Sequence, residues 1–175
     1  DIHGYNGEQG NPICYFNYPD EVPILDCSLI DITGHQYNVG LSIYNADFIH
    51  FKGLTIRNVF QPTTPNSIGD HSPAAGVGII ATTNLIFENF TVSNIGGRGF
   101  GGSSLLGYIN DPGYDTTRFI NVDVHDCNDA LSEVPGNSAD AYKITLQSFQ
   151  VDSLKNPNGV FPVYLMSGCR SWRCA

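Results

Sequence analysis

A short pattern of apolar and polar positions recurs four times along the chain. The shared pattern is apolar, polar, Asn or Gly, apolar, polar, apolar, from which Ile120 and Ser171 depart, and successive copies begin 36, 32 and 47 positions apart. The copies are Phe51–Asn58 (FKGLTIRN), Phe87–Asn94 (FENFTVSN), Phe119–Asp126 (FINVDVHD) and Met166–Arg173 (MSGCRSWR). An alternation of period two is typical of a strand with one buried face. The chain therefore repeats one strand element.

Each copy has Asn or Gly at its third position, residues that tolerate a left-handed backbone. We expect a bend there between two short strands. A second repeated element, Val39–Ile43 (VGLSI) and Val77–Ala81 (VGIIA), precedes the first two copies. Residues 141–145 are its expected counterpart before the fourth copy.

Helical periodicity is almost absent, which leaves the all-β architectures. A propeller blade needs four strands per repeat, and a sandwich does not explain why the same bent pair returns. In a solenoid, each coil stacks its apolar positions on those of the next coil. We therefore predict an all-β parallel β-helix of about five or six coils, with strands within residues 39–58, 77–94 and 117–127. The side chains expected inside are Phe51, Leu54, Phe87, Phe90, Phe119 and Val122.

Two polar or proline-rich segments, 61–73 and 148–159, are predicted to be loops, and loops of this kind commonly build the binding groove of a solenoid. A solenoid also needs a capping element at each end. Residues 172–175 stop in the middle of a coil without one. We therefore expect residues 1–175 to form a single domain that is a portion of a longer β-helix, truncated on its C-terminal side.

The formal net charge of −9 argues against a nucleic-acid partner, because such proteins usually carry a basic face. It is compatible with a polyanionic substrate if divalent cations lie between the two. No apolar window of about 18 residues is present, so no membrane span is expected. The five cysteines are an odd number and match no zinc spacing. We expect buried free thiols, with a disulfide as the alternative in an exported protein.

Acidic residues are concentrated between Asp111 and Asp140, a segment that holds seven of the seventeen Asp and Glu residues and one base, Arg118. Such a cluster could be relieved by a bound cation, and Ca²⁺ takes six to eight oxygen ligands. The alternative is a solvated acidic face or a set of turn residues. His125 alternates with Asp123, so we interpret it as an exposed residue of a polar ladder.

Three ordered elements resemble motifs of the family 9 polysaccharide lyases, calcium-dependent enzymes that cleave pectin-type polymers. They are Asn121–Asp129 (NVDVHDCND), Gly136–Tyr142 (GNSADAY) and Ser167–Trp172 (SGCRSW). The family carries N-x-D-x-x-x-N-x-D, N-A-D-G-F and G-C-R-x-W in that order. Residues 84–100 and the first coil, residues 10–23, also look like the family, so the resemblance covers most of the chain and implies a right-handed parallel β-helix.

The resemblance implies that Asp140, the Asp of the N-A-D-G-F element, is a calcium ligand. Ser138, Ala141 and Tyr142 depart from that element, although the carboxylate is kept. The remaining ligands, in D-D-G-x-D, and the catalytic lysine base are expected beyond Ala175. The implied reaction is β-elimination on pectate or a rhamnogalacturonan-type polymer by a secreted, cell-surface or periplasmic monomer.

Two basic residues are candidates for binding the acidic substrate. Arg98, between glycines, could pair with a uronate carboxylate, and Lys143 lies close to Asp140 in the sequence. Each could instead be a solvated strand residue. Two other functions remain open: a β-helical glycoside hydrolase, and a non-catalytic carbohydrate-binding or adhesin β-helix. The G-H-G and R-I-K elements of polygalacturonases do not occur in these residues.

Overall fold

The computed structural model describes residues 1–67, 69–104, 116–146 and 163–175, and every regular element in these ranges is a β-strand. The strands are β1 (Ile2–His3), β2 (Ile13–Phe16), β3 (Ile24–Asp26), β4 (Val39–Tyr44), β5 (Asp47–Lys52), β6 (Thr55–Val59), β7 (Ala74–Ile80), β8 (Thr83–Ile95), β9 (Gly97–Ser104), β10 (Thr116–Cys127), β11 (Tyr142–Leu146), β12 (Val163–Ser167) and β13 (Arg170–Cys174). In this part of the chain there is no helix long and apolar enough to cross a membrane.

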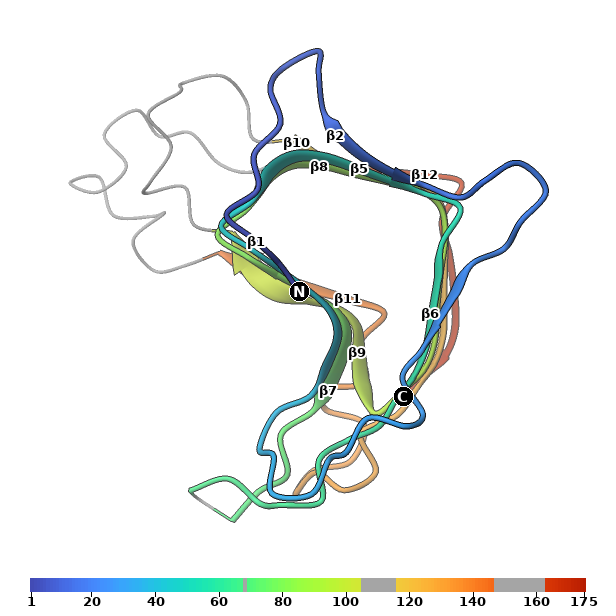
Figure 1. Cartoon of the computed structure of the whole chain (residues 1–175). Helices are drawn as coiled ribbons and strands as arrows, with labels where there is room; N and C mark the ends of the chain where they lie inside the picture. The colour runs from blue at the N-terminus through green and yellow to red at the C-terminus, as the bar shows by residue number, and fades with distance from the viewer. Residues whose placement is uncertain (68, 105–115, 147–162) are drawn as a thin grey trace.

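The strands stack coil upon coil into two parallel sheets. Sheet A has five strands in the order β1-β4-β7-β9-β11. Sheet B has eight, with the path β12-β10-β8-β5-β2 and with β3, β6 and β13 paired beside it. Figure 1 looks down this stack: β5, β8 and β10 superpose on one side, β6 runs down a second, and β7 and β9 lie on a third. The described residues therefore form the predicted parallel β-helix, with five coils.

The register of sheet B confirms the repeat found in the sequence. Phe51 pairs with Phe87, Phe87 with Phe119, and Phe119 with Met166, so the first residues of the four copies stand in one column. Of the six side chains predicted to be inside, five are buried. Leu54 is half-buried and packs against the buried cluster.

The bend at the third position of each copy is also confirmed. Gly53, Asn89, Asn121 and Gly168 all have positive φ, between 49° and 71°. The amide of Asn121 donates a hydrogen bond to Asn89 Oδ1 at 3.2 Å, so the asparagines at this bend support one another between coils. At each bend the chain turns from the first half of sheet B into the second, which is why β8 pairs with both β5 and β6.

A column of small residues allows sheet A to approach the second half of sheet B. The pairing register places Gly40 beside Gly76 and Gly76 beside Gly99, and Ala141 follows in the next coil. A Cβ atom on Gly76 would lie 2.3 Å from Val92 Cγ1, and one on Gly99 would lie 2.2 Å from Val124 Cγ1. Only a residue without a side chain fits at these two points of the core.

The strand pairing of sheet A tests two expectations about the second repeated element. Residues 141–145 do supply the next strand of its sheet, β11, as predicted. The alignment of the first two copies was wrong by two residues, because Leu41 pairs with Val77 and Ile43 pairs with Ile79. A shift by two keeps the same side chains inside, so the pattern of apolar residues does not distinguish the two registers.

The predicted loop at residues 61–73 lies between β6 and β7, as expected, whereas 148–159 lies outside the described residues. The five cysteines are free thiols. Cys27 and Cys127 are buried, and Cys169 and Cys174 are half-buried. Cys14 is exposed, so the expectation of burial was wrong for that residue.

Candidate functional site

The three residues singled out as ligand or substrate contacts, Arg98, Asp140 and Lys143, come together on the outer face of sheet A. Phe100 and Tyr142, paired across β9 and β11, pack against the core, so their neighbours Gly101 and Lys143 face outward. We call this surface the sheet A face. It is built from β9, β11 and the segment just before β11.

Asp140 ends the loop that connects β10 to β11. Its backbone carbonyl accepts a hydrogen bond of 2.9 Å from the Gly99 amide, which fixes it beside β9. Its side chain is 44% exposed, and Oδ2 lies 3.4 Å from Lys143 Nζ. That oxygen is itself buried and makes no hydrogen bond within the described residues. Among the described residues, the close partner of this oxygen is the Lys143 ammonium group, with which it forms an ion pair.

Arg98 lies against the glycine at the centre of the sheet A face. A Cβ atom on Gly101 would be 3.2 Å from Arg98 Cδ, so the arginine side chain covers this glycine. One guanidinium nitrogen is 3.5 Å from Ser138 Oγ, a weak contact, and Nε has no hydrogen-bond partner among the described residues. The Nε atom is buried, so an anionic group could reach Arg98 only through its terminal guanidinium nitrogens.

Asp129 positions the loop that carries Ser138 and Asp140. It is fully buried, and its two carboxylate oxygens accept hydrogen bonds from the backbone amides of Gly136 at 2.5 Å and Ser138 at 2.9 Å. A buried carboxylate with two amide donors fixes a turn strongly. This role was not predicted from the sequence, although an Asp followed by Gly-Asn-Ser a few residues later is a recognisable turn signal.

The described acids of the segment 111–140 do not form the cluster that its composition suggested. Asp123 is paired with Arg170, through contacts of 2.8 and 2.5 Å, and Asp126 is paired with Arg173, both arginines lying one coil further on. Asp129 is buried inside its loop, and Asp111 and Asp115 lie outside the described residues. Within the described ranges no three His, Cys, Asp or Glu side chains converge on a possible metal position.

His125 belongs to this paired surface on the second half of sheet B. Its ring stacks on Trp172 at 4.3 Å, and its Nδ1 lies 2.7 Å from Asp126 Oδ2. Hydrogen bonds from Arg173 and His125 lower the pKa of Asp126. His125 is therefore an outward-facing ladder residue, as interpreted from the alternation, but a half-buried one.

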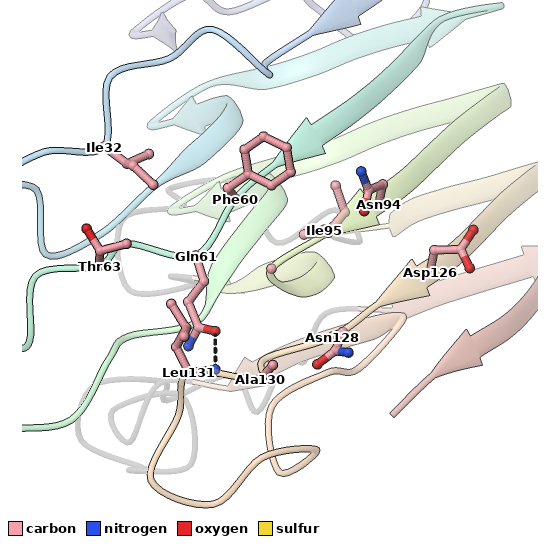
Figure 2. Close-up of a pocket in the computed structure, with 11 residues that line it drawn as sticks. Ile32, Phe60, Gln61, Thr63, Asn94, Ile95, Asp126, Asn128, Ala130 and Leu131 are labelled. Atoms are coloured by element: carbon pink, nitrogen blue, oxygen red, sulfur yellow. Dashed lines mark hydrogen bonds between the residues drawn. The ribbon is translucent and has the colours of Figure 1, made fainter.

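A pocket of about 330 Å³ lies where β8 and β10 end and the adjoining loops begin (Figure 2). Its apolar wall includes Ile32, Phe60, Ile95 and Leu131, and its polar edge includes Asn94 and Asn128. We call it the loop pocket. The loop pocket was not predictable from the sequence, because its lining comes from three loops and two strand ends that are far apart in the chain.

Calcium requires several oxygen ligands, and the sheet A face offers one suitable carboxylate, Asp140. Its Oδ2 atom makes no hydrogen bond among the described residues, but it is ion-paired with Lys143. Lys143 Nζ, 3.4 Å away, balances the same charge. The described residues therefore supply one of the several oxygen ligands that a calcium ion would need.

A comparison with protein families finds one described as "Pel9A-like, right handed beta helix region", which matches residues 2–175. No curated protein and no solved structure matches the chain. The matched span includes all five coils, both sheets and the sheet A face. The chain thus belongs to the Pel9A-like right-handed β-helix family, a pectate lyase-like family.

Proposed function

We propose that this chain is part of a calcium-dependent lyase that cleaves a uronic-acid polymer, pectate or a rhamnogalacturonan-type chain, by β-elimination. The observation that carries the proposal is the gathering of Arg98, Asp140 and Lys143 on one face of a Pel9A-like β-helix. An anionic polymer on a protein of net charge −9 requires local positive charge, and this face supplies two cationic side chains.

Asp140 is the residue of this chain that would hold calcium. A bound calcium ion would act as a Lewis acid on the uronate carboxylate and make the proton on the adjacent carbon more acidic. Arg98 would orient the polymer by donating to a carboxylate oxygen. Lys143 contributes a second positive charge beside Asp140. In the elimination, a base takes that proton, a carbon–carbon double bond forms, and the glycosidic oxygen leaves.

The assay that tests the proposal follows the ultraviolet absorbance of unsaturated oligosaccharides released from polygalacturonate by the full-length protein. We expect absorbance to rise in the presence of calcium and to stop when a chelator is added. Reducing sugar formed without absorbance would indicate a hydrolase, and polymer binding without any product would indicate a non-catalytic β-helix; both results contradict the lyase.

Asp140→Asn in the full-length protein should weaken calcium binding at least about tenfold and reduce activity severely, because it removes one charged ligand. Calorimetric titration with calcium measures the affinity. The matched control is Asp20→Asn, at an exposed position of positive φ that Asn also tolerates. Unchanged calcium affinity in Asp140→Asn would remove Asp140 from the site.

A further inference from the structure

The loop pocket has a hydrogen-bonded wall and an exposed apolar surface. Figure 2 shows Gln61 and Leu131 joined by a hydrogen bond, in which the Leu131 amide donates to Gln61 Oε1 at 3.0 Å. The other end of the Gln61 amide donates to Ser132 Oγ at 2.9 Å and to the His71 carbonyl at 3.1 Å. Gln61 is buried, so these bonds hold the two loops together behind the pocket.

In front of this wall, two large apolar side chains remain accessible. Phe60 is 42% exposed and Leu131 is 47% exposed, while the buried Ile95 and the adjacent Gly96 also line the pocket. At the polar edge, the side-chain nitrogen of Asn94 donates to Asn58 Oδ1 at 2.7 Å. The side-chain oxygen of Asn94 is therefore the atom that can accept a hydrogen bond from a ligand. The Asn128 side chain is exposed.

This combination matches the chemistry of a sugar ring. A pyranose presents C–H groups that pack on an aromatic face and hydroxyl groups that exchange hydrogen bonds with amides. A volume of about 330 Å³ lies at the small end of ligand sites, which suits one or two sugar rings.

The charge of the lining decides which sugar would fit. Neither Lys nor Arg is among the described residues that line the pocket. Its one carboxylate, Asp126, is already engaged by Arg173 and His125. A uronate carboxylate placed here would be desolvated without a cation, which is costly. A neutral sugar carries no such cost.

From the exposed Phe60 ring, the amide edge and the absence of a lining cation in the described pocket, we propose that the loop pocket binds a neutral pyranose. The site is separate from the sheet A face, and its sugar class differs from the uronate proposed there. It would hold a neutral unit of a polysaccharide, so the protein would contact its polymer at two chemically different places. The inference does not depend on calcium or on Asp140.

The test is calorimetric titration of the full-length protein with α-1,4-galactobiose and, separately, α-1,4-digalacturonate, which share ring stereochemistry and linkage and differ in their C6 carboxylates. We expect galactobiose to bind in the millimolar range. Phe60→Ala should weaken this binding about tenfold, because it removes the stacking surface. Tyr18→Ala, at an aromatic residue that is 73% exposed elsewhere, and Asp140→Asn should leave galactobiose binding unchanged.

Three results with galactobiose would overturn the inference. They are no galactobiose binding at millimolar concentration, equal binding by wild type and Phe60→Ala, and loss of galactobiose binding in Asp140→Asn, which would place the sugar on the sheet A face. Digalacturonate binding that depends on Phe60 would equally contradict the neutral-sugar assignment. Because Phe60 is partly exposed, Phe60→Ala should fold, and Asn128→Asp provides a second variant that places an anion at the pocket edge.

Discussion

Glu88 illustrates how single residues on the outer face of sheet B tie one coil to the next. Its carboxylate lies 2.7 Å from Lys52 Nζ and 3.0 Å from His50 Nε2, both on the preceding strand β5. The hydrogen bond from Lys52 is the main cause that lowers the pKa of Glu88 below its usual value. A carboxylate with a lowered folded-state pKa stabilises the fold above its unfolded pKa, and this contribution disappears as the pH falls through the folded value.

Glu88→Gln should therefore destabilise the protein at pH 7 by about 1 kcal/mol or less, since the pair is partly exposed. The difference from wild type should shrink as the pH falls below about 4. Urea unfolding at a series of pH values measures both quantities. A double-mutant cycle with Lys52→Met provides the control, because Glu88→Gln should cost less once the lysine is absent. A difference that stays constant between pH 7 and pH 3 would contradict the assigned pairing.

Individual residues also show where the sequence is informative. Asn and Gly at the bends were predicted from their tolerance of left-handed backbone, because that preference is a property of the residue itself. The ion pairs of the acidic segment, in contrast, were not predicted from the sequence. The partners of Asp123 and Asp126 are Arg170 and Arg173, each 47 positions away, and composition counted within a short window does not include them. Pairing between coils, which depends on register, decides the local charge balance.

At the scale of elements, the column of small residues in sheet A sets how closely the two sheets approach. Gly99→Ala should destabilise the fold by about 1–3 kcal/mol, because the added Cβ would lie 2.2 Å from Val124 Cγ1 and 2.6 Å from the Ala141 carbonyl oxygen. Gly101→Ala is the matched control on the same strand, because its Cβ would meet only the flexible Arg98 side chain and Ala75 at 3.2 Å or more.

Chemical denaturation of the two variants tests this difference. Because Val124 is the closest side chain, Val124→Ala should recover part of the loss when it is combined with Gly99→Ala. Equal stability of the Gly99 and Gly101 variants would show that the core can accommodate a methyl group at this point. A larger loss in Gly101→Ala would mean that the packing of Arg98 over β9 matters more than the glycine column.

The identity of the strands was predictable, but part of their pairing was not. Phe51, Phe87, Phe119 and Met166 are placed in register by a repeat in which most polar and apolar positions agree. The second element is shorter and almost uniformly apolar, so alignments that differ by two residues bury equivalent side chains. Strand β9, rich in glycine, carries too weak a pattern to be recognised as its third copy.

On the scale of the whole molecule, the candidate site is a product of coil stacking. Arg98 and Lys143 come from β9 and β11, which are neighbours only because one complete coil separates them in the sequence. Resemblance to the lyase family singled out Asp140, whereas the buried Asp129 that fixes its loop had no motif to mark it. The loop pocket likewise depends on three loops meeting at one edge, visible at the bottom of Figure 1.

The stack of aromatic rings through the coils predicts an uneven distribution of stability. Phe87 lies in a central coil and contacts four other rings, at centroid distances between 5.0 and 5.4 Å. Tyr15, in the first coil of the same column, stacks on Phe51 at 5.4 Å and is 38% exposed. In a solenoid each coil is stabilised by its two neighbours, so a central cavity weakens two interfaces.

Phe87→Ala should therefore cost about 3–5 kcal/mol, and Tyr15→Ala about 1 kcal/mol. Phe87→Leu keeps most of the apolar volume, so its loss of stability should lie between the losses of these two variants. Hydrogen exchange should show that Tyr15→Ala opens only β1–β3, whereas Phe87→Ala lowers protection in β5, β8 and β10 together. Uniform loss of protection from both variants would mean that the five coils unfold as a single cooperative unit, and the nearest-neighbour description of this β-helix would not hold.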